Sequence, residues 1–289
     1  MAIKVGINGM GRIGRMVIRA IIESKNKNIE IKHINNRSNS EASCSLLKYD
    51  SIHGKFNVDL DFNKNHLIIN KNKILFSQES KVEDIDWKKN NVDYVFECTG
   101  KFNSKDKLLT HLKNGAKKVI VSAPCKNADK TIVYGVNENT LSKKDQIISA
   151  ASCTTNCLAP VANVLNENFQ IEKGFMTTIH AFTSDQRILD NSHKDPRRAR
   201  SASQSIVPTS TGASKIIGEI IPSLKGKLEG VAMRVPIPNV SLIELVFCTK
   251  KEITIEKINE VFFSVSKKQS KKILEITKEK LVSVDFNHN

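Results

Sequence analysis

The chain has 289 residues, and 45 Lys and Arg against 30 Asp and Glu give it a formal net charge of +15. A chain of this length forms one large or two ordinary domains and buries enough surface to fold without disulfides or metal. It has no apolar run that could span a bilayer, no signal-peptide pattern at its start and no CxxC pair. We therefore expect a cytoplasmic protein with no membrane segment, no metal site and no disulfide framework.

The positive charge comes mostly from lysines that are scattered along the chain. Recognition of base edges depends largely on arginine, and a nucleic-acid footprint needs a clustered basic stripe. Solvated surface lysines explain this composition better, so we expect no specific nucleic-acid partner.

Short apolar runs alternate with longer amphipathic runs through the N-terminal half. The pattern predicts strands at residues 3–7, 29–34, 92–96 and 118–121, and helices at 12–24 and 105–114. Strands that alternate with helices form a parallel sheet covered on both faces. The N-terminal half is therefore expected to be an α/β domain.

The pattern changes from about residue 147. Longer strand-like runs cover residues 174–181 and 231–248, and a polar, basic stretch at 183–208 is typical of one long loop. This change predicts a second domain of α+β type that begins near residue 150.

A glycine-rich motif, GMGRIG, occupies residues 9–14, between a predicted strand and a predicted helix. Gly9, Gly11 and Gly14 permit a tight turn and a close approach of the backbone to a pyrophosphate, which the N-terminus of the helix attracts. The acidic ribose partner expected about 20 residues later is replaced by Asn36, followed by Arg37. The motif predicts a dinucleotide site, and an ordinary glycine-rich turn is the alternative.

A second motif, SCTTNC, occupies residues 152–157, where a strand-like run gives way to a helical pattern. Cys153 would lie at the helix N-terminus, whose dipole lowers the pKa of a thiol. Thr154 and Thr155 could cap the helix or bind phosphate, and Cys157 is expected to face the core. Either cysteine alone is more often a buried structural residue.

His180 ends the predicted strand at 174–181 and is the candidate base for a nucleophilic cysteine. Taken alone, it is more often a structural histidine. The segments 195–200, 208–212 and 234–236 supply arginines, threonine hydroxyls and a glycine N–H group, all of which bind phosphate oxygens.

Five segments, INGMGRIGR, SCTTNCLAP, TTIHAFTSDQR, PTSTGASK and RVPIPNVSL, resemble in order those of phosphorylating glyceraldehyde-3-phosphate dehydrogenases. The resemblance covers nearly the whole chain. It implies a Rossmann-type, parallel-sheet NAD-binding domain at residues 1–151 and an α+β catalytic domain with a mostly antiparallel sheet at 152–289. It also implies a homotetramer that acts in glycolysis on glyceraldehyde 3-phosphate and inorganic phosphate.

The resemblance further implies a role for individual residues. Cys153 would be the nucleophile and His180 its base. The substrate phosphate and inorganic phosphate would be bound by Ser152, Thr154, Thr183, Thr211, Gly212 and Arg234. The dinucleotide would be bound by the three motif glycines and by Arg12, Ile13, Asn36, Thr99 and Ser122.

Two departures from the family keep alternatives open. Asn36 in place of the ribose-binding acid admits NADP beside NAD. Relatives continue for roughly forty residues beyond the position of Asn289, so an inactive remnant that only binds dinucleotide is one alternative. Erythrose-4-phosphate dehydrogenase is the other, although Thr183 and residues 209–212 resemble the triose enzyme more closely.

Overall fold

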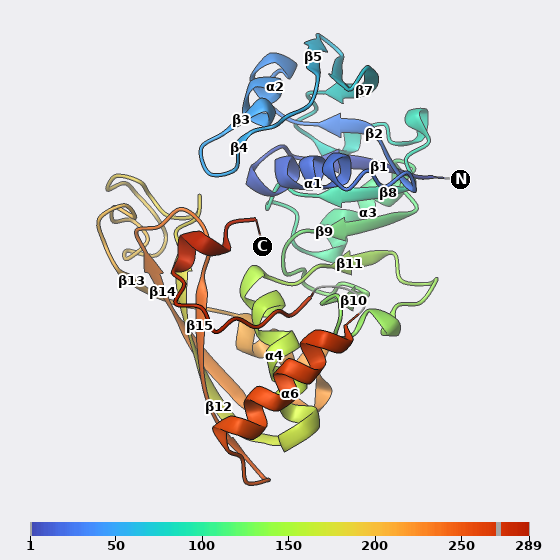
Figure 1. Ribbon diagram of the computed structural model, residues 1–289. Helices are drawn as coiled ribbons and strands as arrows, with labels where there is room; N and C mark the ends of the chain where they lie inside the picture. The colour runs from blue at the N-terminus through green and yellow to red at the C-terminus, as the bar shows by residue number, and fades with distance from the viewer. Residues whose placement is uncertain (1, 270–272, 289) are drawn as a thin grey trace. The chain divides into compact units, whose positions relative to one another are not determined.

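The computed structural model describes residues 2–269 and 273–288 and divides into two compact units. The N-terminal unit contains residues 1–132 and 140–151, and the C-terminal unit contains residues 133–139 and 152–289. Figure 1 shows the elements of both units. No helix in the described ranges combines the length and the apolar character that a bilayer crossing requires.

The N-terminal unit is built on a nine-stranded sheet with the order β10-β11-β9-β8-β1-β2-β7-β6-β5. Its strands are β1 (Ile3–Asn8), β2 (Ile29–Asn35), β5 (Leu60–Asn63), β6 (His66–Ile69), β7 (Asn72–Ser77), β8 (Tyr94–Glu97), β9 (Lys118–Val121), β10 (Lys130–Thr131) and β11 (Ile147–Ser149). All neighbours are parallel except the β5–β6 and β6–β7 pairs. A small antiparallel pair, β3 (Tyr49–Asp50) with β4 (Gly54–Lys55), lies outside this sheet.

Both faces of the large sheet are covered by apolar side chains, as its parallel strands require. The helices of this unit are α1 (Arg12–Glu23), α2 (Ser40–Lys48) and α3 (Lys105–Lys113). One core cluster contains Ile18 of α1, Leu47 of α2 and Val5 and Ile7 of β1. Other clusters contain Val95 of β8 with the single tryptophan of the chain, and Leu108 of α3 with β9 and β11. The odd positions of β1 therefore face α1, and Gly6 and Asn8 face the opposite side.

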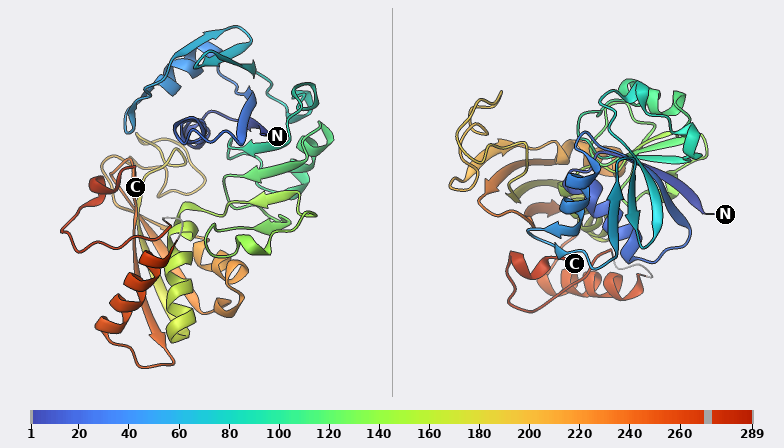
Figure 2. Two further views of the ribbon diagram at one scale, coloured as in Figure 1. Left: turned by 45° about the vertical axis from the view of Figure 1, so that its right-hand side comes forward. Right: turned by 90° about the horizontal axis from the view of Figure 1, so that it is seen from above.

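The C-terminal unit contains a four-stranded sheet with the order β13-β14-β12-β15. Its elements are α4 (Cys153–Phe169), β12 (Ile171–Ala181), β13 (Val207–Ser210), α5 (Ala213–Ile220), β14 (Leu228–Val235), β15 (Leu242–Thr249) and α6 (Ile255–Lys268). The β12–β14 pair is parallel and the other two pairs are antiparallel. Helix α4 contacts β12 and β15, and α6 contacts α4, so these helices stack on the sheet (Figure 2). The expected fold class, a Rossmann-type parallel sheet followed by a mostly antiparallel one, is confirmed.

One expectation about this unit is wrong. The apolar run 231–248 forms two strands, because Pro236 and Pro238 fall between β14 and β15 and proline cannot continue a strand ladder. Residues Ser283–Phe286 form a short 3-10 turn.

Candidate active site

Cys153 is the first residue of α4, as the sequence predicts. The side chain of Ser152 caps the helix, with its Oγ accepting a hydrogen bond from the N–H of Thr155 at 3.1 Å. Ala151, directly before the cap, has a left-handed φ of 57°, a strained conformation for a residue with a side chain. The turn therefore presents an exposed Cys153 at the positive end of a 17-residue helix.

The thiol of Cys153 contacts the imidazole of His180, with 3.1 Å between Sγ and Nε2. This hydrogen bond is the largest cause of a lowered pKa at Cys153, against the opposing effect of partial burial. The charge of the His180 ring and hydrogen bonds from Thr154 lower the pKa further. Residues 27 positions apart in the sequence thus form a thiol–imidazole pair suited to nucleophilic attack.

Arg234 lies beside His180 because the two residues occupy paired positions on the parallel strands β14 and β12. Its Nη1 lies 2.9 Å from His180 Nδ1 and donates to the carbonyl oxygen of Ala181 at 2.9 Å. Its Nε is buried and has no partner among the described residues. Burial, followed by the charge of Arg198, lowers the pKa of Arg234. An anion bound here would relieve both effects.

Arg198 is a candidate that the sequence analysis did not single out from its basic loop. Its Nη2 and Nε donate to Thr209 Oγ1 at 2.8 and 3.1 Å, and Asp185 forms an ion pair with its Nη1. The signal available in the sequence, three arginines within residues 197–200, does not say which of them points toward Arg234. The two guanidinium groups and the Thr209 hydroxyl make this region of the C-terminal unit suited to binding phosphate.

The remaining predicted phosphate-binding residues occupy turns and helix ends. Thr154 is buried in the first turn of α4, and Thr183 lies two residues after the end of β12. Thr211 Oγ1 accepts a hydrogen bond from the N–H of Ala213, and Gly212 is the N-cap of α5. Their role in binding phosphate stays a prediction.

Cys157 does not face the core, contrary to expectation. Its side chain is exposed one turn after Cys153 on α4, because the apolar face of this helix is formed by Leu158, Ala162 and Leu165. Partial burial of its sulfur and the nearby Cys153 raise the pKa of Cys157. The two cysteines therefore differ in the direction of their pKa shifts, and Cys153 is the nucleophilic one.

The glycine motif forms a tight turn between β1 and α1. Gly9 has a φ of 96°, and a Cβ on Gly14 would lie 1.9 Å from the carbonyl oxygen of Gly9, so helix and turn are in direct contact. A Cβ on Gly11 would meet nothing within 4 Å. No side chain caps α1, and its first turn carries no acidic residue. The free N–H donors and the positive dipole at the N-terminus of this helix can therefore bind an anion.

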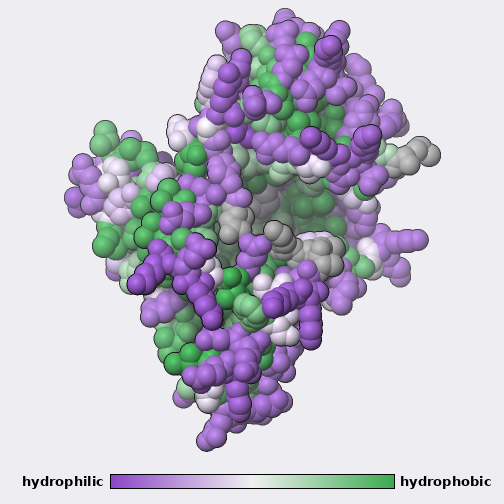
Figure 3. Space-filling view, viewed as in Figure 1, coloured by the Kyte–Doolittle hydropathy of each residue, from purple (hydrophilic) through white to green (hydrophobic). Residues whose placement is uncertain are grey.

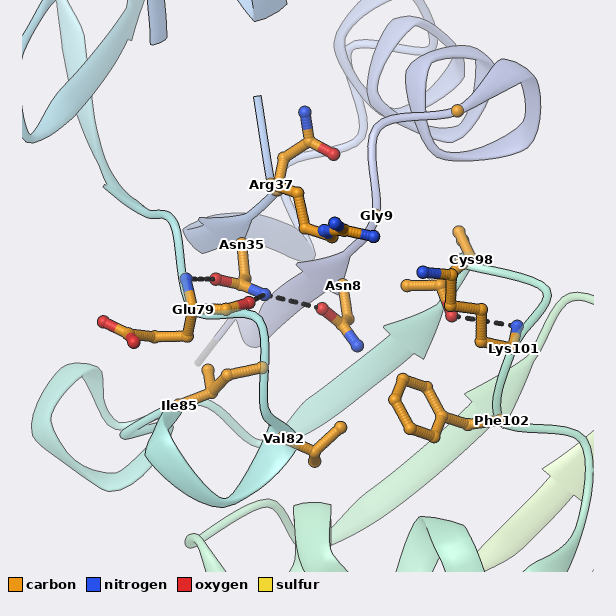
Figure 4. Close-up of a pocket in the computed structure, with 13 residues that line it drawn as sticks. Asn8, Gly9, Asn35, Arg37, Glu79, Val82, Ile85, Cys98, Lys101 and Phe102 are labelled. Carbon is orange, nitrogen blue, oxygen red and sulfur yellow. Dashed lines mark hydrogen bonds between the residues drawn. The ribbon is translucent and has the colours of Figure 1, made fainter. Parts of the chain in front are cut away.

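A pocket of about 180 Å3 lies at the carboxyl ends of β1, β2 and β8 (Figure 4). Its lining residues are Asn8, Gly9, Gly11, Asn35, Asn36, Arg37, Glu79, Val82, Ile85, Cys98, Thr99, Lys101 and Phe102. A crevice at this edge of a doubly wound sheet is where such folds bind dinucleotides. The bare backbone at the glycine turn suits a pyrophosphate. The aromatic ring of Phe102 suits an adenine, and the amide of Asn36 suits a ribose.

Four of the predicted dinucleotide residues do not line this pocket. The guanidinium of Arg12 pairs with Asp50, the side chain of Ile13 is exposed, and Gly14 packs on Gly9. The Oγ of Ser122 donates to the carbonyl oxygen of Glu97. Asn36, by contrast, lies in the pocket, where its Oδ1 accepts from the N–H of Met10 at 3.2 Å and its Nδ2 donates to Ser43 Oγ at 3.0 Å.

Comparison with known proteins agrees with this arrangement. Residues 3–105 match the NAD-binding domain of glyceraldehyde 3-phosphate dehydrogenase, and residues 152–289 match the C-terminal domain of that family. The chain is 50% identical over 288 residues to glyceraldehyde-3-phosphate dehydrogenase of Geobacillus stearothermophilus, which covers 99% of this chain and 85% of that protein. It is 49% identical over 289 residues to the protein of that name from Xanthobacter flavus, covering 100% of this chain and 86% of the relative.

Proposed function

Because the chain belongs to the glyceraldehyde 3-phosphate dehydrogenase family, we propose that it oxidises glyceraldehyde 3-phosphate with NAD and inorganic phosphate. The products are 1,3-bisphosphoglycerate, NADH and a proton. The observation that carries the proposal is the 3.1 Å contact between Cys153 Sγ and His180 Nε2, which favours a thiolate at the end of α4.

The first step joins the Cys153 sulfur to the aldehyde carbon and forms a thiohemiacetal. The N-terminus of α4 supplies N–H donors near the developing oxyanion. His180 takes the proton of the Cys153 thiol on Nε2 and passes it to this oxygen, which becomes the hydroxyl group of the thiohemiacetal. Arg234 and Arg198 bind phosphate groups, so the carbon skeleton is held for attack.

The second step converts the thiohemiacetal into a thioester. The glycine turn at Gly9 and Gly11 would hold NAD, which would supply the acceptor for the hydride of the former aldehyde carbon. His180 removes the proton of the hydroxyl group as the carbonyl re-forms. Inorganic phosphate then attacks the thioester carbon. The Cys153 thiolate leaves and pairs with the protonated His180.

We also propose that the protein works as a cytoplasmic homotetramer, as the family resemblance implies. Apolar side chains reach the surface of the C-terminal unit, among them Leu242 and Val246, which are 58% and 66% exposed on β15. Figure 3 shows such apolar surface between the hydrophilic side chains. Contact between copies of the chain would cover it. Light scattering gives the oligomeric state, and a monomer would contradict this part of the proposal.

A rapid-mixing assay tests the proposed reaction. Without phosphate, the protein with NAD and excess glyceraldehyde 3-phosphate should release NADH in a burst that matches the number of Cys153 thiols, because acylation precedes phosphorolysis. Added phosphate should then allow turnover. A missing burst would indicate a protein that only binds dinucleotide, and a larger kcat/KM for erythrose 4-phosphate would favour the other dehydrogenase.

A further inference from the structure

Three polar side chains form a buried row across the middle of the N-terminal sheet. Asn35 on β2 and Glu97 on β8 both occupy positions paired with Asn8 on β1. Their exposures are 3%, 1% and 3%, and they share the face opposite α1. Asn35 Nδ2 donates to Asn8 Oδ1 at 2.9 Å, as Figure 4 shows, and Asn8 Nδ2 donates to Glu97 Oε2 at 2.6 Å.

The row continues from Glu97 into the core through His111 of α3 and Trp87. Trp87 Nε1 donates to His111 Nδ1 at 2.9 Å, and His111 Nε2 lies 3.1 Å from Glu97 Oε2. An indole N–H can only donate, so Nδ1 must accept and Nε2 must carry the hydrogen that it donates to Glu97. The Trp87 ring is held against the sheet, because a Cβ on Gly6 would lie 2.6 Å from it.

At the other end of the row, the orientation of the Asn35 amide is fixed by its hydrogen bonds. Ser77 Oγ and the backbone N–H of Glu79 both donate to Asn35 Oδ1, at 2.8 and 2.9 Å. The amide nitrogens of Asn35 and then of Asn8 must therefore point toward Glu97. Donors from both ends of the row, Asn8 Nδ2 and His111 Nε2, meet at Glu97 Oε2, while the N–H and hydroxyl of Thr99 donate to Oε1. Only a group that accepts on both oxygens satisfies all of these donors. A carboxylate does so, whereas an amide would oppose one N–H to another.

Glu97 also connects the two walls of the dinucleotide pocket. Its Oε2 holds Asn8, the residue before the glycine turn, and its Oε1 accepts from the backbone N–H of Thr99 at 2.8 Å and from the Thr99 hydroxyl. Thr99 lines the opposite wall, and its Cα lies 3.0 Å from the place of a Cβ on Gly9. One carboxylate thus joins the β1 turn to the segment after β8.

We propose that Glu97 is a positioning residue for NAD, which sets the separation of the two pocket walls, and that His111 and Trp87 hold it in place. The proposal rests on the proposed function only for the identity of the dinucleotide. None of the three lines the pocket. Glu97 acts through Thr99 and Asn8, and His111 and Trp87 act through Glu97. Loss of the carboxylate should therefore weaken NAD binding and leave the chemistry at Cys153 intact.

Isothermal titration calorimetry with NAD tests this on the full chain, with Glu30→Gln as control, since Glu30 is an exposed residue of β2 outside the row. Glu97→Gln should raise the Kd for NAD about tenfold, as one buried donor loses its partner, and Glu30→Gln should leave it unchanged. The rate of Cys153 alkylation by iodoacetamide should be equal in both variants. A Kd for Glu97→Gln within twofold of the wild type would overturn the proposal.

A second pair of variants separates positioning from general stability. His111→Gln keeps one acceptor and one donor, whereas His111→Leu keeps neither. Trp87 is the only tryptophan of the chain, so its emission reports its N–H bond directly. His111→Leu should shift this emission and weaken NAD binding, and His111→Gln should restore both.

Equal Kd values for the two His111 variants would overturn the proposal, as would a wild-type protein that fails to bind NAD. An absent NADH burst would contradict only the proposed function, because the Kd is read without turnover.

Discussion

Replacing Asn36 by aspartate should increase the preference for NAD over NADP. Asn36 makes two contacts, accepting from the N–H of Met10 and donating to Ser43 Oγ. A carboxylate keeps both, because the Ser43 hydroxyl can turn to donate. Asn36→Asp therefore changes the charge of the pocket and preserves its geometry.

The magnitude follows from the charge. The carboxylate of the Asn36→Asp variant would repel the 2′-phosphate that distinguishes NADP from NAD. Two unit charges about 5 Å apart repel by about 3 kcal/mol at an effective dielectric constant of about 20. The pocket is open to solvent, so ionic screening reduces this to about 1.5 kcal/mol at physiological salt. The ratio of kcat/KM for NAD to that for NADP should thus rise at least about tenfold.

The assay measures this ratio in the wild type, in Asn36→Asp and in Asn26→Asp. Asn26 is exposed after α1, and its Oδ1 accepts from the N–H of Asn28, so the control adds the same charge at a similar local contact. Arg37→Ala should weaken NADP use more than NAD use, because Arg37 lines the pocket and offers a cation to the extra phosphate. If Asn36→Asp changes the ratio no more than Asn26→Asp does, the electrostatic argument is wrong.

Cys153→Ser should abolish turnover with NAD affinity unchanged, and iodoacetamide should label Cys153 before Cys157, since their pKa values shift in opposite directions; mass spectrometry showing the reverse order would refute this. His180→Asn should slow the burst by about 10²–10⁴-fold and move Cys153 alkylation to higher pH, and an unchanged pH profile would contradict the ion pair. Burial lowers the pKa of His33 to about 4. As the pH falls from 6.5 to 4, the unfolded chain therefore binds a proton at His33 that the folded chain does not, and the free energy of unfolding should fall by about 3 kcal/mol. Urea unfolding should show a flatter pH dependence in His33→Gln, and an equal slope would argue against a buried neutral ring. Ala151→Gly should raise the free energy of unfolding by about 1 kcal/mol, because glycine adopts the left-handed φ of this position without strain. A lower free energy of unfolding would show that the turn is not strained.

Much of the fold was predictable because its elements carry local signals. The strand, glycine turn and helix at residues 3–23 follow from apolar period and glycine spacing. The start of α4 follows from the change of a strand-like run into a helical pattern, although the structure caps it with Ser152 and not with Thr154 or Thr155. The two-strand nature of residues 231–248 was equally visible in Pro236 and Pro238, which the apolar run concealed. The strands β5 to β7 were missed because their apolar runs are short and interrupted by Asn and Lys.

The site was predictable as a set of residues but not as an arrangement. The sequence pattern made Cys153 and His180 candidates, and the family resemblance assigned roles to both of them and to Arg234. What the sequence lacks is register: His180 and Arg234 meet because β12 and β14 pair at those positions. The same limit hid Glu97, His111 and Trp87, which carry no recognisable motif and meet only through the pairing of β1 with its neighbours and the packing of α3.

The contact between Asn8 and Glu97 also has a consequence for the order of folding. It joins residues that are 89 positions apart, and closing a loop of that length costs about 4 kcal/mol in chain entropy. The pocket therefore exists only after β1 has paired with both β2 and β8, late in the assembly of the N-terminal unit. NAD then stabilises this finished state alone, by about 2.7 kcal/mol at a concentration of one hundred times its Kd. Resistance of the chain to proteolysis should consequently rise and fall with the concentration of NAD.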